Sequence, residues 1–386
     1  MRAVTVHEGQ LNVEEIPAPV PGPGQVLVDV TRCGICGSDL HARQHADETA
    51  DAVAEVGYDH FMRSNHTVVM GHEFTGRVAA YGPKTRKKWP VGTSVVALPI
   101  LGTPEGIHLT GLTRHATGGY AEQVVVNESV TFEVPDGVSD DHAAMTEPLA
   151  VALHAVNRGE VKAKDTAVVI GCGPIGLAVI LMLKAQGVRT VIASDFSAGR
   201  RALAARCGAD VVVNPAVESP WASFADSTYL QGPTDLGQFG LDTMKQLRAV
   251  PLLPWRRVME AAQKLGAAPR GPVVFECVGM PGIIEDIVSH APLLSRVVVV
   301  GVCMEPDTFR PVMALNKELE LRFVFAYDPA EFHRTLMMIA SGKVDPSPLL
   351  TGTVGLEGVA TAFDQLADPE QHAKILIDPT SRATRA

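Results

Sequence analysis

The sequence predicts an α/β protein with two domains: a doubly wound parallel sheet flanked by helices, and a smaller, barrel-like β domain. Three observations support this prediction. The chain has 386 residues, which exceeds one comfortable hydrophobic core. Short β-like runs separated by glycine and proline occupy its first part, up to about Val156. From Asp165 onward, β-like and helix-like segments alternate, as they do in parallel sheets.

The predicted elements of the first part are short. Residues 25–30, 92–97 and 120–126 are rich in valine and are bounded by turn-forming residues. Runs of this length and spacing predict a compact β domain. Over residues 140–156 the apolar positions recur every three to four residues instead, which predicts a helix.

The second part contains nearly continuous valine and isoleucine runs, which are typical of strands buried on both faces of a parallel sheet. The predicted strands are residues 167–170, 190–194, 211–213, 273–275 and 297–300, with a candidate sixth strand at 321–327. Helices are predicted through residues 177–180 and 200–203.

Two segments interrupt this order. Residues 44–64 form an acidic, helix-prone insertion, and residues 218–257 contain two tryptophans and several prolines without a clean period. We interpret the second segment as a surface excursion that precedes a helix near residues 258–265. Its role, as an interface or as a lobe over the mouth of a site, stays open at this point.

Composition and charge exclude several classes of protein. A hydrophobic content of 46% with 20% charged residues excludes wholesale disorder. A net charge of −10 disfavours a nucleic-acid surface, and the basic residues between 84 and 88 are more typical of a solvated loop. Six cysteines in so long a chain do not suggest a disulfide framework.

The uncharged stretch 166–183 contains three glycines and a proline, which favours strand, turn and helix over a membrane span. We therefore expect a cytoplasmic protein.

A glycine-rich turn between a predicted strand and a predicted helix indicates a dinucleotide site. Its residues are Gly171, Gly173, Pro174, Ile175 and Gly176, in the pattern Gly-x-Gly-x-x-Gly. The first glycine permits a tight turn, the second lets the backbone approach a pyrophosphate, and the third lets the helix pack on the strand. The helix N-terminus supplies amide donors for the phosphates.

The residues that follow the next predicted strand indicate which dinucleotide is bound. Asp195 lies at the end of that strand, at the spacing where an acid accepts hydrogen bonds from the adenosine ribose. Its charge would repel a 2′-phosphate, so we expect NAD rather than NADP. Arg200 and Arg201 lie close behind and moderate this preference.

A thiol, an imidazole and several carboxylates indicate a catalytic zinc site, which needs three protein ligands and one open position. Cys36 and His72 are the natural pair, and Glu73 and Glu147 are the candidates for the third ligand. Glu73 could bind the metal directly or lie behind it, and the sequence does not separate these alternatives. Cys33 more plausibly packs as a small apolar residue than completes a redox pair with Cys36.

These motifs together resemble those of the zinc-dependent medium-chain dehydrogenases, which include alcohol, polyol and threonine dehydrogenases. The resemblance extends over nearly the whole chain, including residues 118–122, 275–279 and 340–343. It implies a catalytic domain like GroES at residues 1–157, completed by 325–386, around a Rossmann domain at 158–324. It also implies a homodimer or homotetramer, in which the strand near 321–327 could pair across a two-fold axis.

The resemblance also implies roles for individual residues. Cys36 and His72 match the first two zinc ligands, and Glu147 stands where one branch has a second cysteine, as in the sorbitol-like and butanediol-like branches. Ser38 matches the hydroxyl that contacts the substrate oxygen, and His41 matches a relay histidine. Asp39 matches an acid that orients His72, as carboxylates behind metal-bound imidazoles do.

The chain departs from the family in two ways. Many members hold a second, structural zinc with four cysteines in the lobe that corresponds to residues 99–114, and this stretch contains no cysteine. We therefore expect one catalytic zinc per chain and no structural zinc. The gap between His41 and His72 and the excursion after Glu218 are both unusually long.

Together, the metal ligands and the dinucleotide motif predict an oxidoreductase that moves a hydride between an alcohol and NAD. Zinc would lower the pKa of the alcohol, the proton would leave through Ser38 and His41, and the substrate would be a small molecule. Glu147 and the first insertion favour secondary alcohols, diols or polyols. Two alternatives remain: a metal-free quinone or enone reductase of the same superfamily, and a non-catalytic NAD-binding protein. The intact metal ligands argue against both.

Overall fold

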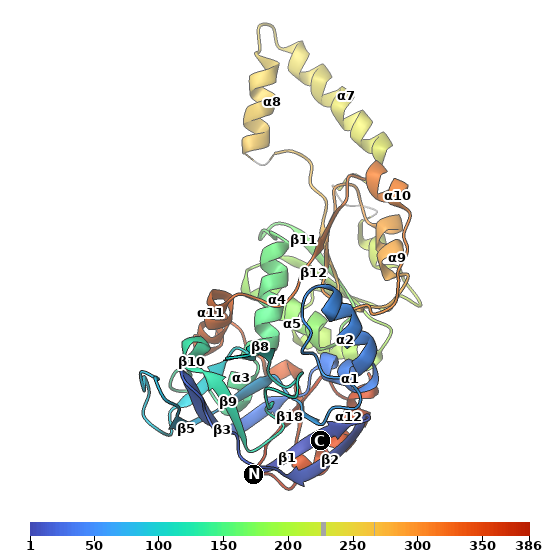
Figure 1. Cartoon of the computed structure of the whole chain (residues 1–386). Coiled ribbons are helices and arrows are strands. Elements are labelled where there is room, and N and C mark those ends of the chain that lie inside the picture. Colours follow the sequence, from blue (N-terminus) through green and yellow to red (C-terminus); the bar gives the residue numbers. More distant parts are fainter. Residues whose placement is uncertain (225–228, 266) are drawn as a thin grey trace.

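The structure, a computed structural model, describes residues 1–224, 229–265 and 267–386. Two large sheets form its two halves, and a pair of helices extends away from one of them (Figure 1). The first half contains the N-terminus and also the last strands of the chain, so the chain leaves this half and returns to it.

The strands of the first half come mainly from the start of the chain: β1 (Arg2–His7), β2 (Gln10–Glu15), β3 (Gln25–Gly34), β4 (Val68–Val69), β5 (Glu73–Tyr81), β6 (Ser94–Ala97), β7 (Ile100–Thr103), β8 (Gly106–Leu109), β9 (Gln123–Asn127) and β10 (Thr131–Glu133). Its helices are α1 (Gly37–Gln44), α2 (Ala46–Glu55), α3 (Asp140–Ala144) and α4 (Thr146–Arg158). The last part of the chain adds α11 (Pro329–Ala340), β17 (Leu350–Val354), α12 (Val359–Ala367) and β18 (Lys374–Ile377).

The seven-stranded sheet of this half has β3 at its centre. Its order is β10-β6-β5-β3-β18-β17, and β9 pairs with β3 as well. The end strands β10 and β17 do not pair with each other in the described part of the chain, so the predicted barrel-like domain is present with an open sheet. Valines on β3, β5 and β9 fill its core and are at most 4% exposed: Val26, Val28, Val30, Val78, Val124 and Val126.

The second half is a parallel sheet of six strands, as predicted. In chain order they are β11 (Thr166–Ile170), β12 (Thr190–Ser194), β13 (Val211–Val213), β14 (Val273–Glu276), β15 (Arg296–Val299) and β16 (Glu320–Phe323). Helices α5 (Pro174–Ala185), α6 (Ala198–Arg206), α9 (Ile283–His290) and α10 (Pro311–Asn316) connect them. The spatial order β13-β12-β11-β14-β15-β16 reverses direction at β11, which confirms the doubly wound α/β prediction.

The insertion between β13 and β14 differs from its prediction. Residues 218–257 were expected to be an irregular excursion, but the structure contains α7 (Pro233–Ala249) there, followed by α8 (Trp255–Lys264). Gly237 and Gly240 interrupt the apolar pattern of α7, which explains why the sequence did not predict this helix. Residues 225–228 of this segment lie outside the described residues.

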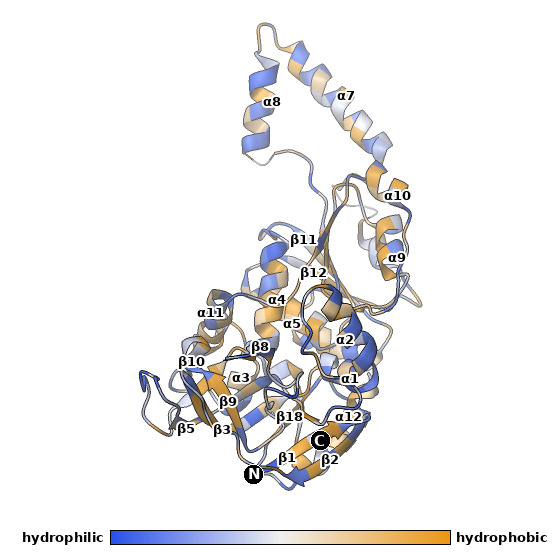
Figure 2. Ribbon diagram, viewed as in Figure 1, coloured by the Kyte–Doolittle hydropathy of each residue, from blue (hydrophilic) through white to orange (hydrophobic). Residues whose placement is uncertain are grey.

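The two helices, which we call the arm (residues 233–264), extend from the parallel sheet without covering it (Figure 1). Every residue of α7 and α8 is described, and none is buried. Figure 2 shows apolar and polar residues alternating along both helices. The helix predicted near residues 258–265 corresponds to α8, and the helix-prone insertion at 44–64 contains α2. No helix in the described residues is both long enough and apolar enough to cross a membrane.

Candidate metal and dinucleotide sites

Strand pairing brings the first two predicted metal ligands together. Cys36 follows the end of β3, and His72 directly precedes β5. The two strands are antiparallel, and Gly34 at the end of β3 lies opposite Glu73 at the start of β5. Cys36 and His72, which are 36 positions apart in the sequence, are therefore neighbours at one end of this strand pair.

The backbone before His72 depends on a glycine. Gly71 has a φ of +98°, and a Cβ atom at this position would lie 2.4 Å from the ring of Tyr120. A side chain would therefore meet both backbone strain and a clash. The turn holds His72 beside the buried carboxylate of Asp39, with Nδ1 and Oδ1 3.3 Å apart.

Asp39 is anchored by two other donors. The Tyr120 hydroxyl donates to its Oδ2 at 2.6 Å, and the Cys36 amide donates to the same atom at 3.0 Å. Burial alone would raise the pKa of Asp39, but the charge and contact of His72 together with these hydrogen bonds lower it. Burial likewise opposes the charged form of His72, yet the Asp39 carboxylate raises the pKa of that imidazole well above its usual value.

Cys36, His72 and Glu73 form a compact group of potential metal ligands. One ligand atom from each lies within 4.8 Å of the others, and this is the group of three found among the described residues. The Ser38 hydroxyl lies 3.3 Å from Nε2 of His72, the nitrogen that faces away from Asp39. The hydroxyl of Ser38 is thus within reach of whatever this nitrogen binds.

Glu73 is held from behind by a lysine that the sequence analysis missed. Lys374 Nζ lies 2.7 Å from each carboxylate oxygen of Glu73 and 2.9 Å from the carbonyl oxygen of Ile35. Both side chains are almost fully buried. Burial disfavours the charged lysine, but the Glu73 carboxylate outweighs it and raises the pKa of Lys374. Strand β18 positions this lysine because it pairs with the end of β3.

Glu147 lies in the first turn of α4, outside the compact group of three. Its Oε1 accepts a hydrogen bond of 2.8 Å from the Tyr327 hydroxyl. Burial raises the pKa of Glu147 to about 7, although the positive charges of His72 and Lys374 act in the opposite direction. A carboxylate that shares the electric field of His72 and Glu73 is close enough to influence a cation bound there.

The two predicted proton-relay residues lie on one helix. Ser38 and His41 are three residues apart on α1, so they occupy neighbouring positions on one face. Partial burial and the nearby His45 ring lower the pKa of His41, which favours its neutral form. No direct contact between Ser38 and His41 is present in the described structure.

The donor set fits a zinc ion. Zinc binds thiolate, imidazole and carboxylate ligands, and a catalytic site keeps one position open. Cys36, His72 and Glu73 supply one ligand of each type, and Asp39 and Lys374 support two of them from behind. Buried atoms Nδ1 of His72 and Oδ1 of Asp39 make no hydrogen bond of standard geometry, so their 3.3 Å contact leaves room to tighten.

The glycine-rich turn has the backbone that a pyrophosphate site needs. Gly171 has a φ of +90°, and a Cβ atom on Gly176 would lie 1.9 Å from the Gly171 carbonyl oxygen. Above Gly173 the only atom within 4 Å of such a Cβ is Cζ of Arg200, at 4.0 Å, among the residues described. Helix α5 begins with Pro174 and Ile175 at this turn, so the amides of its first turn have no partner within the helix.

Asp195 closes the turn from the next strand. Its carboxylate accepts hydrogen bonds from the amides of Cys172 at 2.7 Å and Ser197 at 2.8 Å. Arg201 donates to the carbonyl oxygens of Asp195 and Phe196, whereas the guanidinium of Arg200 lies over the turn. The arginine that approaches the phosphate position is therefore Arg200.

A cavity of about 230 Å³ opens at the carboxyl ends of β14, β15 and β16. Its lining includes Glu276, Gly279, Cys303 and Phe323. Glu276 accepts hydrogen bonds from the amides of Val278 and Gly279, and burial raises its pKa. In doubly wound sheets, ligands bind outside the carboxyl ends of the strands, so this cavity is a candidate extension of the dinucleotide site.

The sequence analysis did not identify Lys374, Tyr327 or Tyr120 as site residues. A signal was available for Lys374, because a charged residue at the start of the apolar run 374–377 must find a partner when the strand is buried. The two tyrosines had no local signal, since both reach the site through contacts between distant segments.

Comparison with known proteins gives two family matches. Residues 22–136 match the model for the alcohol dehydrogenase GroES-like domain, and residues 174–341 match the model for a zinc-binding dehydrogenase. Together the two matches include most strands of both sheets described above.

Individual relatives match over most of their length. The (R,R)-butanediol dehydrogenase of Bacillus subtilis is 30% identical, over 98% of this chain and 100% of the relative. The sorbitol dehydrogenase of Bos taurus is 29% identical, over 94% of this chain and 92% of the relative. The crystal structure of 2R,3R-butanediol dehydrogenase from Bacillus subtilis superimposes with a TM-score of 0.74 and 28% identity, covering 98% of this chain and 99% of that one.

Proposed function

Because this chain belongs to the zinc-dependent medium-chain dehydrogenase/reductase family, we propose that it oxidises secondary alcohols, diols or polyols with NAD and one catalytic zinc ion. Membership of this family makes it an NAD(P)-linked oxidoreductase that acts on alcohols and their carbonyl products. The observation that carries the finer proposal is the compact group of Cys36, His72 and Glu73 at the end of the β3–β5 pair.

Cys36 and His72 would hold the zinc ion, and Glu73 and Glu147 are the two candidates for the third ligand. Glu73 lies within ligand distance of the other two residues but is paired with Lys374. The lysine and a bound metal ion would therefore compete for its carboxylate. Glu147 is bound to Tyr327 and approaches from α4. When bound, zinc supplies Lewis-acid polarisation of the alcohol oxygen.

The proton of the alcohol needs a path that the chain itself provides. Ser38 offers a hydroxyl beside His72 Nε2, and His41 offers a neutral imidazole one helical turn farther along α1. A neutral imidazole at the protein surface can accept a proton and pass it to solvent. This arrangement supports the relay that we propose for Ser38 and His41.

The preference for NAD is supported by Asp195. Its buried carboxylate lies at the end of β12, where a 2′-phosphate would meet a negative charge. Arg200 lies on the other side of the turn, over Gly173, and is placed to meet the pyrophosphate. Gly171, Gly173, Pro174, Ile175 and Gly176 form the backbone of this proposed site.

The proposed division into domains follows the two sheets. We assign residues 1–157 and 325–386 to the catalytic domain and residues 158–324 to the dinucleotide-binding domain. The separate seven-stranded and six-stranded sheets support this assignment. We also propose a homodimer or homotetramer, supported by the open edge of β16, where Phe323 and Phe325 are 66% and 88% exposed. The cytoplasmic location expected from the sequence stays a prediction.

The experiment that tests the function is NADH formation from NAD⁺ with primary alcohols, secondary alcohols, diols and polyols, before and after zinc chelation. We expect turnover with secondary alcohols or diols that chelation abolishes and added zinc restores. Cys36→Ser should be inactive, whereas Cys207→Ser, a buried thiol far along the chain, is the matched control. Turnover that is indifferent to chelation would instead support the metal-free reductase, and NADH binding without any turnover would support the non-catalytic alternative.

A further inference from the structure

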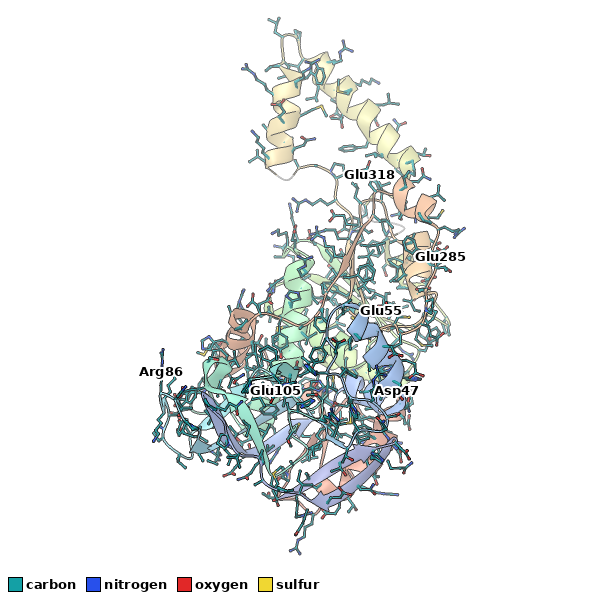
Figure 3. All side chains as sticks on the ribbon, in the orientation of Figure 1. Asp47, Glu55, Arg86, Glu105, Glu285 and Glu318 are labelled. Carbon is teal, nitrogen blue, oxygen red and sulfur yellow. The ribbon has the colours of Figure 1, made fainter. Side chains whose placement is uncertain are left out.

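Three imidazole rings form a cluster outside the site described above. The ring centroids of His60 and His108 are 4.9 Å apart, those of His108 and His115 are 4.9 Å apart, and those of His60 and His115 are 5.5 Å apart. We call these residues the histidine trio. His60 follows α2, His108 lies on β8, and His115 lies in the loop after β8. Glu105, labelled in Figure 3, marks the turn between β7 and β8.

The central ring of the trio has an unused buried nitrogen. His108 is 0% exposed, and its Nδ1 makes no hydrogen bond in the described structure. Its other nitrogen, Nε2, lies 3.0 Å from the Thr103 hydroxyl. A buried nitrogen without a partner is unfavourable because it has lost its hydration, so Nδ1 of His108 is available to a ligand that is not part of the chain.

The two outer rings also have nitrogen atoms available. In the described structure neither nitrogen of His60 makes a hydrogen bond, and the aromatic rings beside it are those of Tyr58, His108 and His115. His115 is exposed, and its Nε2 accepts a hydrogen bond of 3.3 Å from Arg114. Each of the three residues can therefore offer a nitrogen once Arg114 moves aside.

The surroundings of His108 favour its neutral ring. Burial lowers the pKa of His108, the neighbouring His115 and His60 lower it further, and Glu105 is the carboxylate that acts in the opposite direction. Neutral imidazole is the form of histidine that binds metal ions. Glu105 is also bonded to Thr103, so a carboxylate and a hydroxyl lie behind the central ring.

We propose that the histidine trio binds a divalent transition-metal cation, such as Zn²⁺ or Ni²⁺, at a site separate from the Cys36 group. Imidazole is a favoured ligand for these ions, and Thr103 would fix the ring of His108 as outer partners of metal-bound histidines do. The expectation of one zinc per chain rests on the missing cysteines in residues 99–114 and takes no account of histidine ligands.

Two local movements accompany binding. The trio is not among the groups whose ligand atoms all lie within 4.8 Å of one another, so the more accessible rings of His60 and His115 must rotate toward His108. Arg114 must also leave His115, because its positive charge competes with the cation. Both changes involve side chains at the surface and leave the backbone of β7 and β8 in place.

The test is the number of Zn²⁺ ions bound per chain after equilibrium dialysis of the purified full-length protein, with Ni²⁺ as a second probe. We expect two zinc ions in the unmodified chain. His60→Ala and His115→Ala should each remove one ion or weaken it at least about tenfold, on the scale of lost metal-site contacts. His290→Ala, which changes an exposed histidine paired with Asp286, is the matched control and should keep both ions.

Two further variants sharpen the result. Cys36→Ser should remove the other ion and leave the trio's ion bound. Arg114→Ala should tighten binding at the trio by roughly threefold, the scale of an exposed charge interaction. NADH formation by His115→Ala should match that of the unmodified chain.

The proposal is overturned if the unmodified chain binds a single ion that Cys36→Ser removes, or if His60→Ala and His115→Ala leave the count at two. These outcomes do not depend on the proposed activity. A chain that binds two ions but oxidises no alcohol would overturn the proposed function and leave the trio site intact.

Discussion

Lys374 and Glu73 show how one ion pair can support a reactive group from behind. The exposed fractions of the two side chains are 1% and 0%, so neither charge is solvated by water. The lysine shields the carboxylate while holding both of its oxygens. Removing the lysine would leave an uncompensated buried charge, which is far more costly than removing both partners.

We therefore predict that Lys374→Met lowers the free energy of unfolding of the metal-free protein by about 3–5 kcal/mol. The measurement is urea denaturation followed by circular dichroism. The double variant Lys374→Met/Glu73→Gln should recover most of this loss, because neither member of the pair then carries a charge. Equal losses in the single and double variants would show that packing, not charge, accounts for the effect.

Glu147 predicts a dependence of stability on pH in the metal-free protein. Its pKa is about 7 in the folded chain, against a reference value of 4.5. The folded state therefore binds the proton more tightly, so this stabilisation is complete below pH 4.5 and is lost as the pH rises through 7. At 1.36 kcal/mol per pKa unit, the rise from 4.5 to about 7 contributes roughly 3 kcal/mol.

The measurement is the free energy of unfolding at pH 5 and at pH 8, compared between the unmodified chain and Glu147→Gln. The amide cannot titrate, so the variant should lose less stability than the unmodified chain between the two pH values. Glu133→Gln, which changes an exposed glutamate on β10, is the matched control. Identical pH profiles for Glu147→Gln and the unmodified chain would contradict the assignment.

At the residue scale, the sequence predicted the ligand types and, by resemblance, the acid Asp39 behind His72, but it did not predict Lys374 behind Glu73. Cys36, His72 and Glu73 could be named because their chemistry and spacing are local signals. Lys374 lies 301 positions from Glu73 and meets it only through the pairing of β18 with β3. The roles of Ser38, His41, Glu73 and Glu147 stay predictions until a bound metal and substrate are observed.

At the scale of elements, periodicity was sufficient wherever an element is buried. Strands β11, β12, β14 and β15 are runs of valine and isoleucine that lie between two layers of helices, and all were predicted. Helix α7 was not predicted, because no partner surface imposes a clear apolar stripe on it and two glycines dilute the pattern. Hydrophobic patterning records packing, so an unpacked helix leaves a weak signal.

In the proposed function, the turn after β12 selects the dinucleotide. We predict that Asp195→Ala lowers the ratio of NADH to NADPH affinity by about tenfold or more, the effect of a charged hydrogen-bond partner. The measurement is calorimetric titration with each dinucleotide. Asp195→Asn should change the ratio by a similar factor, because it also removes the negative charge.

Asp195 also accepts hydrogen bonds from the amides of Cys172 and Ser197. Some loss of affinity for both dinucleotides is therefore expected in the two Asp195 variants. The ratio of affinities separates this structural effect from selectivity. An unchanged ratio in both variants would show that Asp195 only shapes the turn.

At the scale of the whole molecule, the two ends of the chain contribute strands to the same sheet. Strands β17 and β18 follow the parallel sheet in sequence but join the sheet that contains β3. One side of the molecule is thereby built from both ends of the chain, as Figure 1 shows. The sequence alone suggested this division by resemblance only, because sequence patterns identify strands without specifying which distant strands pair.

The open edge of the parallel sheet predicts the assembly. Strand β16 pairs with β15 on one side only, and Phe325 beyond its end is 88% exposed. An exposed apolar edge strand is a natural pairing site for a second copy. We predict that the unmodified chain is the proposed dimer or tetramer and that Phe325→Asp is a monomer in size-exclusion chromatography with light scattering, with an unaltered circular dichroism spectrum.

Phe239→Asp on the arm is the matched control and should leave the mass unchanged, since Phe239 is exposed on α7. The opposite result, with the control dissociating the assembly and Phe325→Asp retaining it, would place the subunit contact on the arm.

The arm and the packed sheets of the molecule should have very different local stabilities. None of the residues of α7 and α8 contributes to a hydrophobic core, so their backbone amides are protected only by helical hydrogen bonds. Short helices without tertiary packing open readily. In deuterated water, the amides of the arm should exchange at a rate set by local opening of the arm. The amides of α5 and β11 should exchange only through global unfolding. The same chain therefore carries a segment whose order can be gained or lost without any change at the reacting centre.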